Sequence, residues 1–309
     1  MTGPRQDDAF SLSPLPGSIG VEVIGLDADS EISAESAGRL REIWLDAGVV
    51  LFRGSATSPE ALLRISRCLG ELEPHPIEHF RLPEYPELIL LSNEKALTGP
   101  VYEFDGVATY GHIPWHTDLA FTTTPNAGAV LRMVRNSEHG GQTGWIDTAL
   151  AYEALDADTR QRIEGLEARY IFSPDLEGMR FNKPGGSLLQ GTIKDLPSFP
   201  PVIHPLVWRH PETGRRILNI STLNIQGVEG MPEAESDALI QSLVEHALQP
   251  RFRYIHAWKN NDVIAWDNRR TMHMAFGHPV AETRIVQRST IRGSVKMGRS
   301  LDDEEVQSA

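Results

Sequence analysis

Residues 114–121 read PWHTDLAF and place a histidine and a carboxylate, His116 and Asp118, two positions apart. If this segment is a strand, residues i and i+2 point to the same face, so both side chains can reach one metal ion. A distant histidine such as His273 would complete the site. Two imidazoles and one carboxylate that leave the opposite positions open are typical of non-haem Fe(II) oxygenases, so the pattern indicates oxygen chemistry.

The composition is that of an ordinary globular protein. Of the 309 residues, 40% are hydrophobic and 23% are charged. No apolar run approaches the roughly 20 residues that a membrane-spanning helix needs. The N-terminus carries acidic residues where a signal peptide has a basic region followed by an apolar one. We therefore expect a cytoplasmic protein that does not cross a membrane.

The formal charge of −13 and the single cysteine, Cys68, exclude several kinds of site. A nucleic-acid surface needs clustered lysines and arginines, so we expect no nucleic-acid partner and a small-molecule substrate instead. One cysteine excludes intrachain disulfides and thiolate-rich zinc sites, so His, Asp or Glu must hold any metal. An anionic substrate would need a local basic pocket, because the overall field would repel it.

Many short strand patterns with helices inserted between them predict the fold class. We expect an α+β fold whose core is a double-stranded β-helix, or jelly roll, with flanking helices and lid loops. The strands are expected along the whole chain, including 48–54, 87–92, 126–135, 251–258, 263–266 and 282–293. The helices are expected at 34–46 with Ser33 as N-cap, from Ser58 to Gly70, near 148–167 and at 233–248.

Irregular segments at 93–113 and 172–201 lack a clean apolar period, and we expect both to be lids beside the site. The chain is expected to form one domain over residues 1–309. Its ends, about 1–15 and 297–309, are expected to be flexible tails.

Two histidine pairs at i,i+4 spacing compete with the proposed triad as metal ligands. They are His112 with His116, around Pro114, and His75 with His79, around Pro76. Because a proline disfavours a helix at each place, neither pair is expected on one helical face.

The remaining motifs follow in a fixed order after PWHTDLAF. They are GGQTGWID at 140–147, HPETGRR at 210–216, NDVIAWDNRRTMH at 261–273 and RIVQRSTIRG at 284–293. With these motifs the chain, from about residue 15 to 295, resembles the TauD/TfdA family of Fe(II)- and 2-oxoglutarate-dependent dioxygenases. Arg269 and Arg270, inside the fourth motif, are expected to be solvated loop charges.

The resemblance implies roles for five residues. His116, Asp118 and His273 would be the catalytic iron ligands, Arg284 would bind the distal carboxylate of 2-oxoglutarate, and Thr143 would also contact this co-substrate. A guanidinium suits a planar carboxylate, because two parallel N–H donors fix both its charge and its orientation. The cofactor set would be Fe(II), 2-oxoglutarate and O2. Hydroxylation is the default reaction, and desaturation or bond cleavage are variants of it.

Two further residues would bind the substrate. Arg288 lies four residues beyond Arg284, on the same face of a strand, and both Arg288 and His75 match family positions that contact a sulfonate. We therefore expect a small substrate with a carboxylate, sulfonate or sulfate group. The alternative is that Arg288 contacts the co-substrate or a buried aspartate.

Two other classes of protein stay open from the sequence. A zinc-dependent hydrolase could use the same His and Asp residues without a co-substrate, although Arg284 and the GGQT motif would then have no purpose. A noncatalytic jelly-roll binding protein could carry the triad as a structural feature. A homo-oligomer is compatible with each reading.

Overall fold

The computed structural model of the protein describes residues 10–17, 19–74, 81–94, 97, 99–173, 175–191 and 198–302. The helices are α1 Ala34–Ala47, α2 Pro59–Leu69, α3 Thr148–Glu153, α4 Ala157–Ile163 and α5 Glu233–Ala247, with 3-10 turns at Leu176–Gly178 and Pro250–Phe252. The strands of the first half are β1 Ser11–Pro14, β2 Val21–Ile24, β3 Val49–Phe52, β4 Arg81–Leu82, β5 Tyr85–Ser92, β6 Val101–Phe104, β7 Val107–His116, β8 Gly128–Arg135, β9 Thr143–Asp147 and β10 Glu167–Tyr170. Those of the second half are β11 Ser187–Gln190, β12 Val202–Pro205, β13 Val207–Arg209, β14 Arg216–Leu218, β15 Ile225–Val228, β16 Arg253–His256, β17 Val263–Asp267, β18 Thr271–Pro279, β19 Ile285–Ile291 and β20 Arg299–Ser300.

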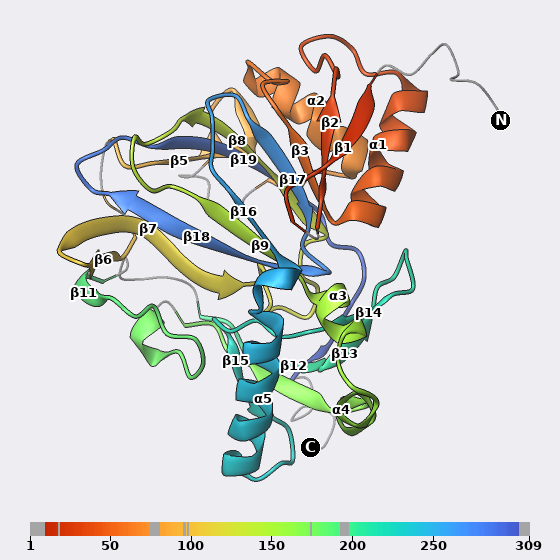
Figure 1. Cartoon of the computed structure of the whole chain (residues 1–309), viewed down its shortest axis with the longest axis vertical. Helices are drawn as coiled ribbons and strands as arrows, with labels where there is room; N and C mark the ends of the chain where they lie inside the picture. Colours follow the sequence, from red (N-terminus) through yellow and green to blue (C-terminus); the bar gives the residue numbers. More distant parts are fainter. Residues whose placement is uncertain are drawn as a thin grey trace.

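Two large sheets form the core, as predicted for a jelly roll. Sheet A has the strand order β1-β2-β3-β17-β8-β19-β5-β4, and sheet B has the order β11-β6-β7-β18-β9-β16. Figure 1 shows the strands of the two sheets side by side, with α1 and α2 beside β1–β3 and α5 beside β12 and β15. Strands β15, β10, β12 and β20 form a smaller third sheet, and β13 and β14 form a hairpin.

Three apolar layers hold these sheets together. Between sheets A and B lies a cluster that includes Trp145, Trp258 and Trp266. The outer face of sheet A packs on α1 and α2 through residues such as Trp44, and the outer face of sheet B packs on α3 and α5 through residues such as Trp115. Each large aromatic side chain removes roughly 150–250 Å² from water, so these clusters dominate the core.

The two N-terminal helices begin at their predicted caps. Ser33 accepts a hydrogen bond from the backbone N–H of Ser36 at 3.1 Å, and Ser58 accepts one from Ala61 at 3.2 Å. Such caps contribute about 1 kcal/mol each to helix stability. The helix expected near 148–167 is instead two helices, because Asp156 caps a new helix, α4, by accepting from the backbone of Thr159.

The first predicted lid is largely a β-hairpin. Strands β6 and β7 pair from Val101 to Tyr110, and the chain turns at Asp105 and Gly106, which both have positive φ values. An Asp-Gly pair between strands is a strong signal for a two-residue hairpin turn, and the apolar pattern on either side was too loose to reveal the strands. The prediction of a loop at 93–113 was therefore wrong over most of its length.

The second predicted lid, 172–201, is irregular where it is described, apart from the 3-10 turn and β11, which extends sheet B. The two ends of the described chain differ from the predicted tails. Residues Ser11–Pro14 pair with β2 beside the buried Phe10, and Arg299–Ser300 pair with β12. Burial of one aromatic ring and the strand hydrogen bonds attach these segments to the body of the protein.

No helix in the described part of the chain is long and apolar enough to cross a membrane. The cytoplasmic location and the extent of one domain over 1–309 stay predictions.

Candidate active site

Two histidines and one aspartate meet where β7 and β18 lie side by side. His116, the last residue of β7, is directly opposite His273 of β18, and their ring centroids are 4.1 Å apart. The Nε2 atoms of His116 and His273 lie 3.6 and 3.7 Å from Oδ1 of Asp118. The candidate ligand atoms of the three residues lie within 4.8 Å of one another, so they could hold one metal ion.

Asp118 is not in a strand, which corrects the argument made from the sequence. Strand β7 ends at His116, and the next residues form a turn in which Leu119 has a φ of 53°. Asn268, buried in the loop before β18, holds this turn: its Oδ1 accepts from the Asp118 N–H at 2.9 Å, and its Nδ2 donates to the Asp118 carbonyl at 3.0 Å. The side chain therefore reaches the histidines because of a turn fixed by a distant asparagine.

The protonation states of the triad suit metal ligation. His116 Nδ1 lies 2.8 Å from the Pro114 carbonyl. A carbonyl only accepts, so Nδ1 carries a proton, and Nε2 is the nitrogen that is directed towards Asp118. Burial lowers the pKa of His273 well below its usual range, helped by the neighbouring His116. The His273 imidazole is thus available as a neutral ligand.

The two carboxylate oxygens of Asp118 face different partners. Oδ1 faces the two histidines, and Oδ2 accepts from Arg288 Nη2 at 2.5 Å. Burial alone would raise the pKa of Asp118, but the positive charge of Arg288, with smaller contributions from contacts with His273 and His116, holds it well below its usual value. An ionised carboxylate and two neutral imidazoles form the donor set that non-haem Fe(II) prefers.

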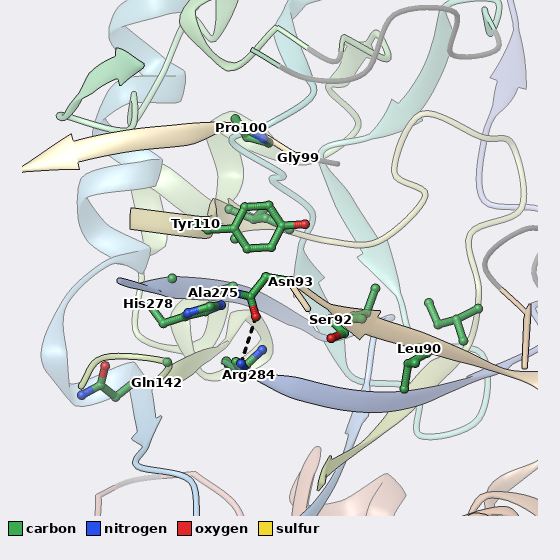
Figure 2. Close-up of a pocket in the computed structure, with 16 residues that line it drawn as sticks. Leu90, Ser92, Asn93, Gly99, Pro100, Tyr110, Gln142, Ala275, His278 and Arg284 are labelled. Carbon is green, nitrogen blue, oxygen red and sulfur yellow. Dashed lines mark hydrogen bonds between the residues drawn. The ribbon is translucent and has the colours of Figure 1, made fainter. Parts of the chain in front are cut away.

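A pocket with a volume of about 330 Å³ lies between β5 of sheet A and β7 and β18 of sheet B, the two strands that carry His116 and His273. Figure 2 shows Arg284 in this pocket, with Asn93, Tyr110 and His278 around it. Ala275, two residues after His273, also lines it, so the pocket continues the interior face that carries the triad. The remaining lining residues are Ile89, Leu90, Leu91, Ser92, Gly99, Pro100, Gly111, Ile113, Gly141, Gln142 and Gly277.

Arg284 immediately precedes β19, and its side chain is available to a ligand. Its backbone N–H donates to Asn93 Oδ1 at 3.0 Å, but its buried Nε atom has no hydrogen-bond partner among the described residues. Burial lowers the pKa of Arg284 to about 10, so the guanidinium is still charged at neutral pH. A buried charge without a partner is costly, which is the expected signature of an anion site.

The glycine pair before Thr143 makes room for this guanidinium. A Cβ atom placed at Gly141 would lie 3.3 Å from Arg284 Nε and 2.6 Å from Ser137 Oγ. Gly141 also has a φ of 75°, which other residues rarely adopt. A side chain at position 141 would therefore collide with Ser137 and crowd the Arg284 guanidinium.

Thr143 and Arg288 lie on strands that border the same interior. Thr143 opens β9 opposite the pocket residue Ala275, and its Oγ1 accepts from the indole N–H of Trp258 at 3.0 Å. Arg288, on β19, lies with its guanidinium carbon 5.4 Å from the centre of the Trp266 ring. The alternative that Arg288 contacts a buried aspartate is thus the contact seen here. His75 lies outside the described residues.

Sequence reasoning missed three residues at this site: Asn93, Trp258 and Asn268. Asn268 follows the aspartate that ends β17, and an Asp-Asn pair after a strand signals a turn but not the partner that the turn holds. Asn93 and Trp258 belong to no local pattern that would have identified them.

A jelly roll that carries a His/Asp/His cluster, with a pocket arginine whose buried Nε has no partner among the described residues, is typical of Fe(II) oxygenases that use an oxo-acid co-substrate. The chain belongs to the family described as taurine catabolism dioxygenase TauD, TfdA family, which matches residues 11–290. It is accordingly a non-haem iron oxidoreductase that uses Fe(II), 2-oxoglutarate and O2.

Individual relatives agree with this assignment. The chain is 30% identical to (S)-phenoxypropionate/alpha-ketoglutarate-dioxygenase of Sphingobium herbicidovorans, over 92% of this chain and 96% of that one. It is 29% identical to the alpha-ketoglutarate-dependent 2,4-dichlorophenoxyacetate dioxygenase of Cupriavidus pinatubonensis, over 90% and 96% of the two chains. A crystal structure of a taurine dioxygenase from Burkholderia xenovorans superposes with a TM-score of 0.73 at 29% identity, covering 96% and 94% of the chains. These relatives support neither the zinc-dependent hydrolase nor the noncatalytic binding protein.

Proposed function

We propose that His116, Asp118 and His273 bind the Fe(II) and that Arg284 and Thr143 bind 2-oxoglutarate. The observation that carries this assignment is the guanidinium of Arg284, which lines the pocket and whose buried Nε has no hydrogen-bond partner among the described residues. When bound, iron and 2-oxoglutarate supply the activation of O2 and the oxidation of a C–H bond, with release of succinate and CO2. The chain contributes orientation, charge and the exclusion of water.

Each residue has a defined task in this proposal. Arg284 offers parallel N–H donors that fix the distal carboxylate of the co-substrate in charge and direction. Asp118, held ionised by Arg288, the neutral His273 and Nε2 of His116 would hold the metal ion together. The pocket walls above Arg284 are mostly apolar, which strengthens each charged interaction inside.

We further propose that the substrate is a small organic anion with an apolar body. The relatives named above are named for a phenoxypropionate and for 2,4-dichlorophenoxyacetate, which are carboxylates, and a sulfonate or sulfate has the same charge requirement. Leu90, Leu91 and Ile113 at the pocket give an apolar wall. A local positive charge is needed because the chain has a net charge of −13.

Arg288 can serve this anion only in part. One of its nitrogens is bonded to Asp118, while its buried Nε lacks a partner in the part of the chain that the structure describes. We propose that the remaining donors face the substrate anion and that His75 assists. We also propose that the reaction is a hydroxylation, that the protein is cytoplasmic and that it forms a homo-oligomer.

An anaerobic binding experiment tests the metal and co-substrate assignment. Fe(II) and 2-oxoglutarate added to the wild-type protein without oxygen should give the weak visible charge-transfer band of the iron chelate. Asp118→Ala, confirmed as folded by its circular dichroism and melting temperature, should give no band. A wild-type protein without the band, or an unchanged band in Asp118→Ala, would contradict the assignment. Succinate release across a panel of small carboxylates, sulfonates and sulfates would then identify the substrate.

A further inference from the structure

A buried hydrogen bond connects Trp258 to the proposed co-substrate residue Thr143. The indole Nε1 of Trp258 lies 3.0 Å from Thr143 Oγ1, and each of the two residues is 5% exposed. Trp258 lies just after β16, and Thr143 opens the neighbouring strand β9, where it pairs with His256. The bond therefore joins two adjacent strands on the interior side of sheet B.

The direction of this bond determines what the threonine can still do. An indole N–H can only donate, so Thr143 must be the acceptor. A hydroxyl has two acceptor sites and one hydrogen, and the hydrogen remains unused. Among the residues that the structure describes, Thr143 Oγ1 has no acceptor for this hydrogen. A buried donor without an acceptor is unusual in a folded protein and indicates that a ligand supplies it.

Thr143 lies next to residues that line the pocket that contains Arg284. Thr143 lies opposite Ala275, a pocket residue, and Cβ atoms of opposite residues share one face of a sheet. Gly141, two residues before Thr143 in the chain, lies close to Arg284, because a Cβ atom placed on it would be 3.3 Å from Arg284 Nε. The hydroxyl and the guanidinium thus border the same interior space.

The indole itself is fixed by a buried polar network. The His256 ring stands edge-on to the Trp258 ring, with a centroid distance of 4.7 Å and an interplanar angle of 88°. His256 lies between the Tyr254 hydroxyl at 2.7 Å and Asp262 Oδ2 at 3.0 Å, so its orientation is fixed from both sides. With a rigid neighbour on one face, Trp258 can present its N–H in only one direction.

We propose that Trp258 is a positioning residue for 2-oxoglutarate. Its N–H occupies one acceptor site of the Thr143 hydroxyl and thereby directs the hydroxyl hydrogen to a carboxylate oxygen of the co-substrate. Without the indole N–H, the hydroxyl rotates freely and donates less often to the ligand. This inference rests on the proposed role of Thr143 in co-substrate binding.

The test is an anaerobic titration of the Fe(II) protein with 2-oxoglutarate, followed by the visible chelate band. Trp258→Phe keeps an aromatic ring and removes only the donor. We expect its dissociation constant for 2-oxoglutarate to rise about 3- to 10-fold, the value of one directed hydrogen bond. The affinity for Mn(II) alone should be unchanged, because Trp258 does not touch the triad residues.

Trp145→Phe is the matched control. Trp145 belongs to the same aromatic cluster, 6.4 Å from Trp258 between ring centroids, but its indole nitrogen has no hydrogen-bond partner in the described residues. Its substitution should leave the dissociation constant unchanged. An equal rise in both variants would mean that core packing, and not the hydrogen bond, is responsible, and the inference would be wrong.

Thr143→Val separates the inference from the function on which it rests. If Trp258 acts through Thr143, the double variant should bind 2-oxoglutarate as weakly as Thr143→Val alone. Additive effects, or a normal Trp258→Phe beside a weakened Thr143→Val, would overturn the positioning role and leave the proposed function intact. A normal Thr143→Val would remove the co-substrate role of Thr143 and the inference with it.

Discussion

Arginines on the two faces of sheet A differ in the hydrogen bonds that they make within the protein. On the outer face, Arg132 of β8 is 5% exposed, and three of its nitrogens donate to the chain. Its partners are the Ala56 carbonyl at 2.9 Å, Gln287 Oε1 at 2.8 Å, Asn261 Oδ1 at 2.9 Å and the Thr57 carbonyl at 2.5 Å. On the inner face, Arg284 and Arg288 each keep a buried Nε without a partner in the described chain.

This difference separates a structural arginine from a functional one. Burial lowers the pKa of both Arg132 and Arg284, so desolvation is unfavourable for each charge. Of these two residues, only Arg132 offsets the cost of desolvation within the protein, because its nitrogens bond to carbonyl and amide oxygens. In the proposed function, Arg284 offsets this cost when a carboxylate of 2-oxoglutarate binds, so its side chain would be a binding group.

The substitution Arg284→Met is expected to have the largest effect, on the binding of 2-oxoglutarate. A buried charge-assisted pair is worth roughly 2–5 kcal/mol, so the dissociation constant for 2-oxoglutarate should rise on the order of 1,000-fold. The melting temperature should stay the same or rise, since no described residue loses a side-chain hydrogen bond. The measurements are the anaerobic chelate titration and a thermal melt. A clear loss of stability with normal co-substrate binding would make Arg284 structural after all.

Arg132→Met is the converse experiment. The substitution leaves buried oxygens on Ala56, Gln287 and Asn261 without a donor, and we expect the free energy of unfolding to fall by about 3 kcal/mol. Binding of 2-oxoglutarate to the folded variant should be unchanged, because Arg132 lies on the opposite face of the sheet. Urea denaturation and the same titration measure both quantities. Weakened co-substrate binding would show that the two faces are coupled.

The sequence predicted the elements that depend on local chemistry. Apolar spacing and the caps Ser33 and Ser58 located α1 and α2, and the ordered motifs located the triad. The hypothesis that residues 114–121 form a strand was wrong beyond His116, yet the three residues of the cluster still lie close together. They do so because Asn268, 150 residues away from Asp118, holds the turn. No short-range pattern in the sequence contains that information.

The partners of buried charges could not be predicted from the sequence. Arg270 was expected in solvent, but it is 2% exposed and pairs with Asp147 of β9. Its Nη1 donates to carbonyls at the end of α1, Leu45 at 3.0 Å and Asp46 at 2.8 Å, and its buried Nε has no partner among the described residues. Such a network depends on how three distant segments pack, and sequence spacing does not encode that arrangement. The same limit applies to Arg132. For Arg288 the sequence offered a buried aspartate as an alternative partner, but it did not identify that partner as Asp118.

His204 sharpens the comparison, because the protein provides partners for only one of its protonation states. The residue is 1% exposed on β12, its Nε2 lies 3.0 Å from the Ala120 carbonyl, and its buried Nδ1 has no described partner. Burial lowers the pKa of His204 to about 4. Protonation would add a second donor with nothing to accept it.

The sign of the pH effect follows from linkage. An unfolded histidine takes up a proton near pH 6.5, whereas folded His204 does so only near its lowered pKa. Its stabilising effect is therefore complete above pH 6.5 and is lost as the pH falls towards 4. We expect a loss of about 2 kcal/mol of unfolding free energy between pH 7.5 and pH 5 from this residue. Urea denaturation of the wild type and of His204→Gln at both pH values measures it, and parallel losses in the two proteins would contradict the assignment.

The substitution Arg288→Lys has the smallest expected effect. It tests whether Arg288 serves mainly to orient Asp118 or to bind the substrate. Arg288 donates to Oδ2 of Asp118 and so fixes the oxygen that does not face the histidines. Residues that orient a metal ligand typically change metal affinity 10- to 100-fold when they are replaced, and a lysine keeps the charge, so we expect about a tenfold loss of Mn(II) affinity. Electron paramagnetic resonance measures the concentration of free Mn(II). The control is Arg292→Lys, because Arg292 follows β19 directly and forms an exposed ion pair with Glu71. Unchanged Mn(II) affinity together with weaker substrate binding would instead place Arg288 with Arg284, as a residue kept for the ligand.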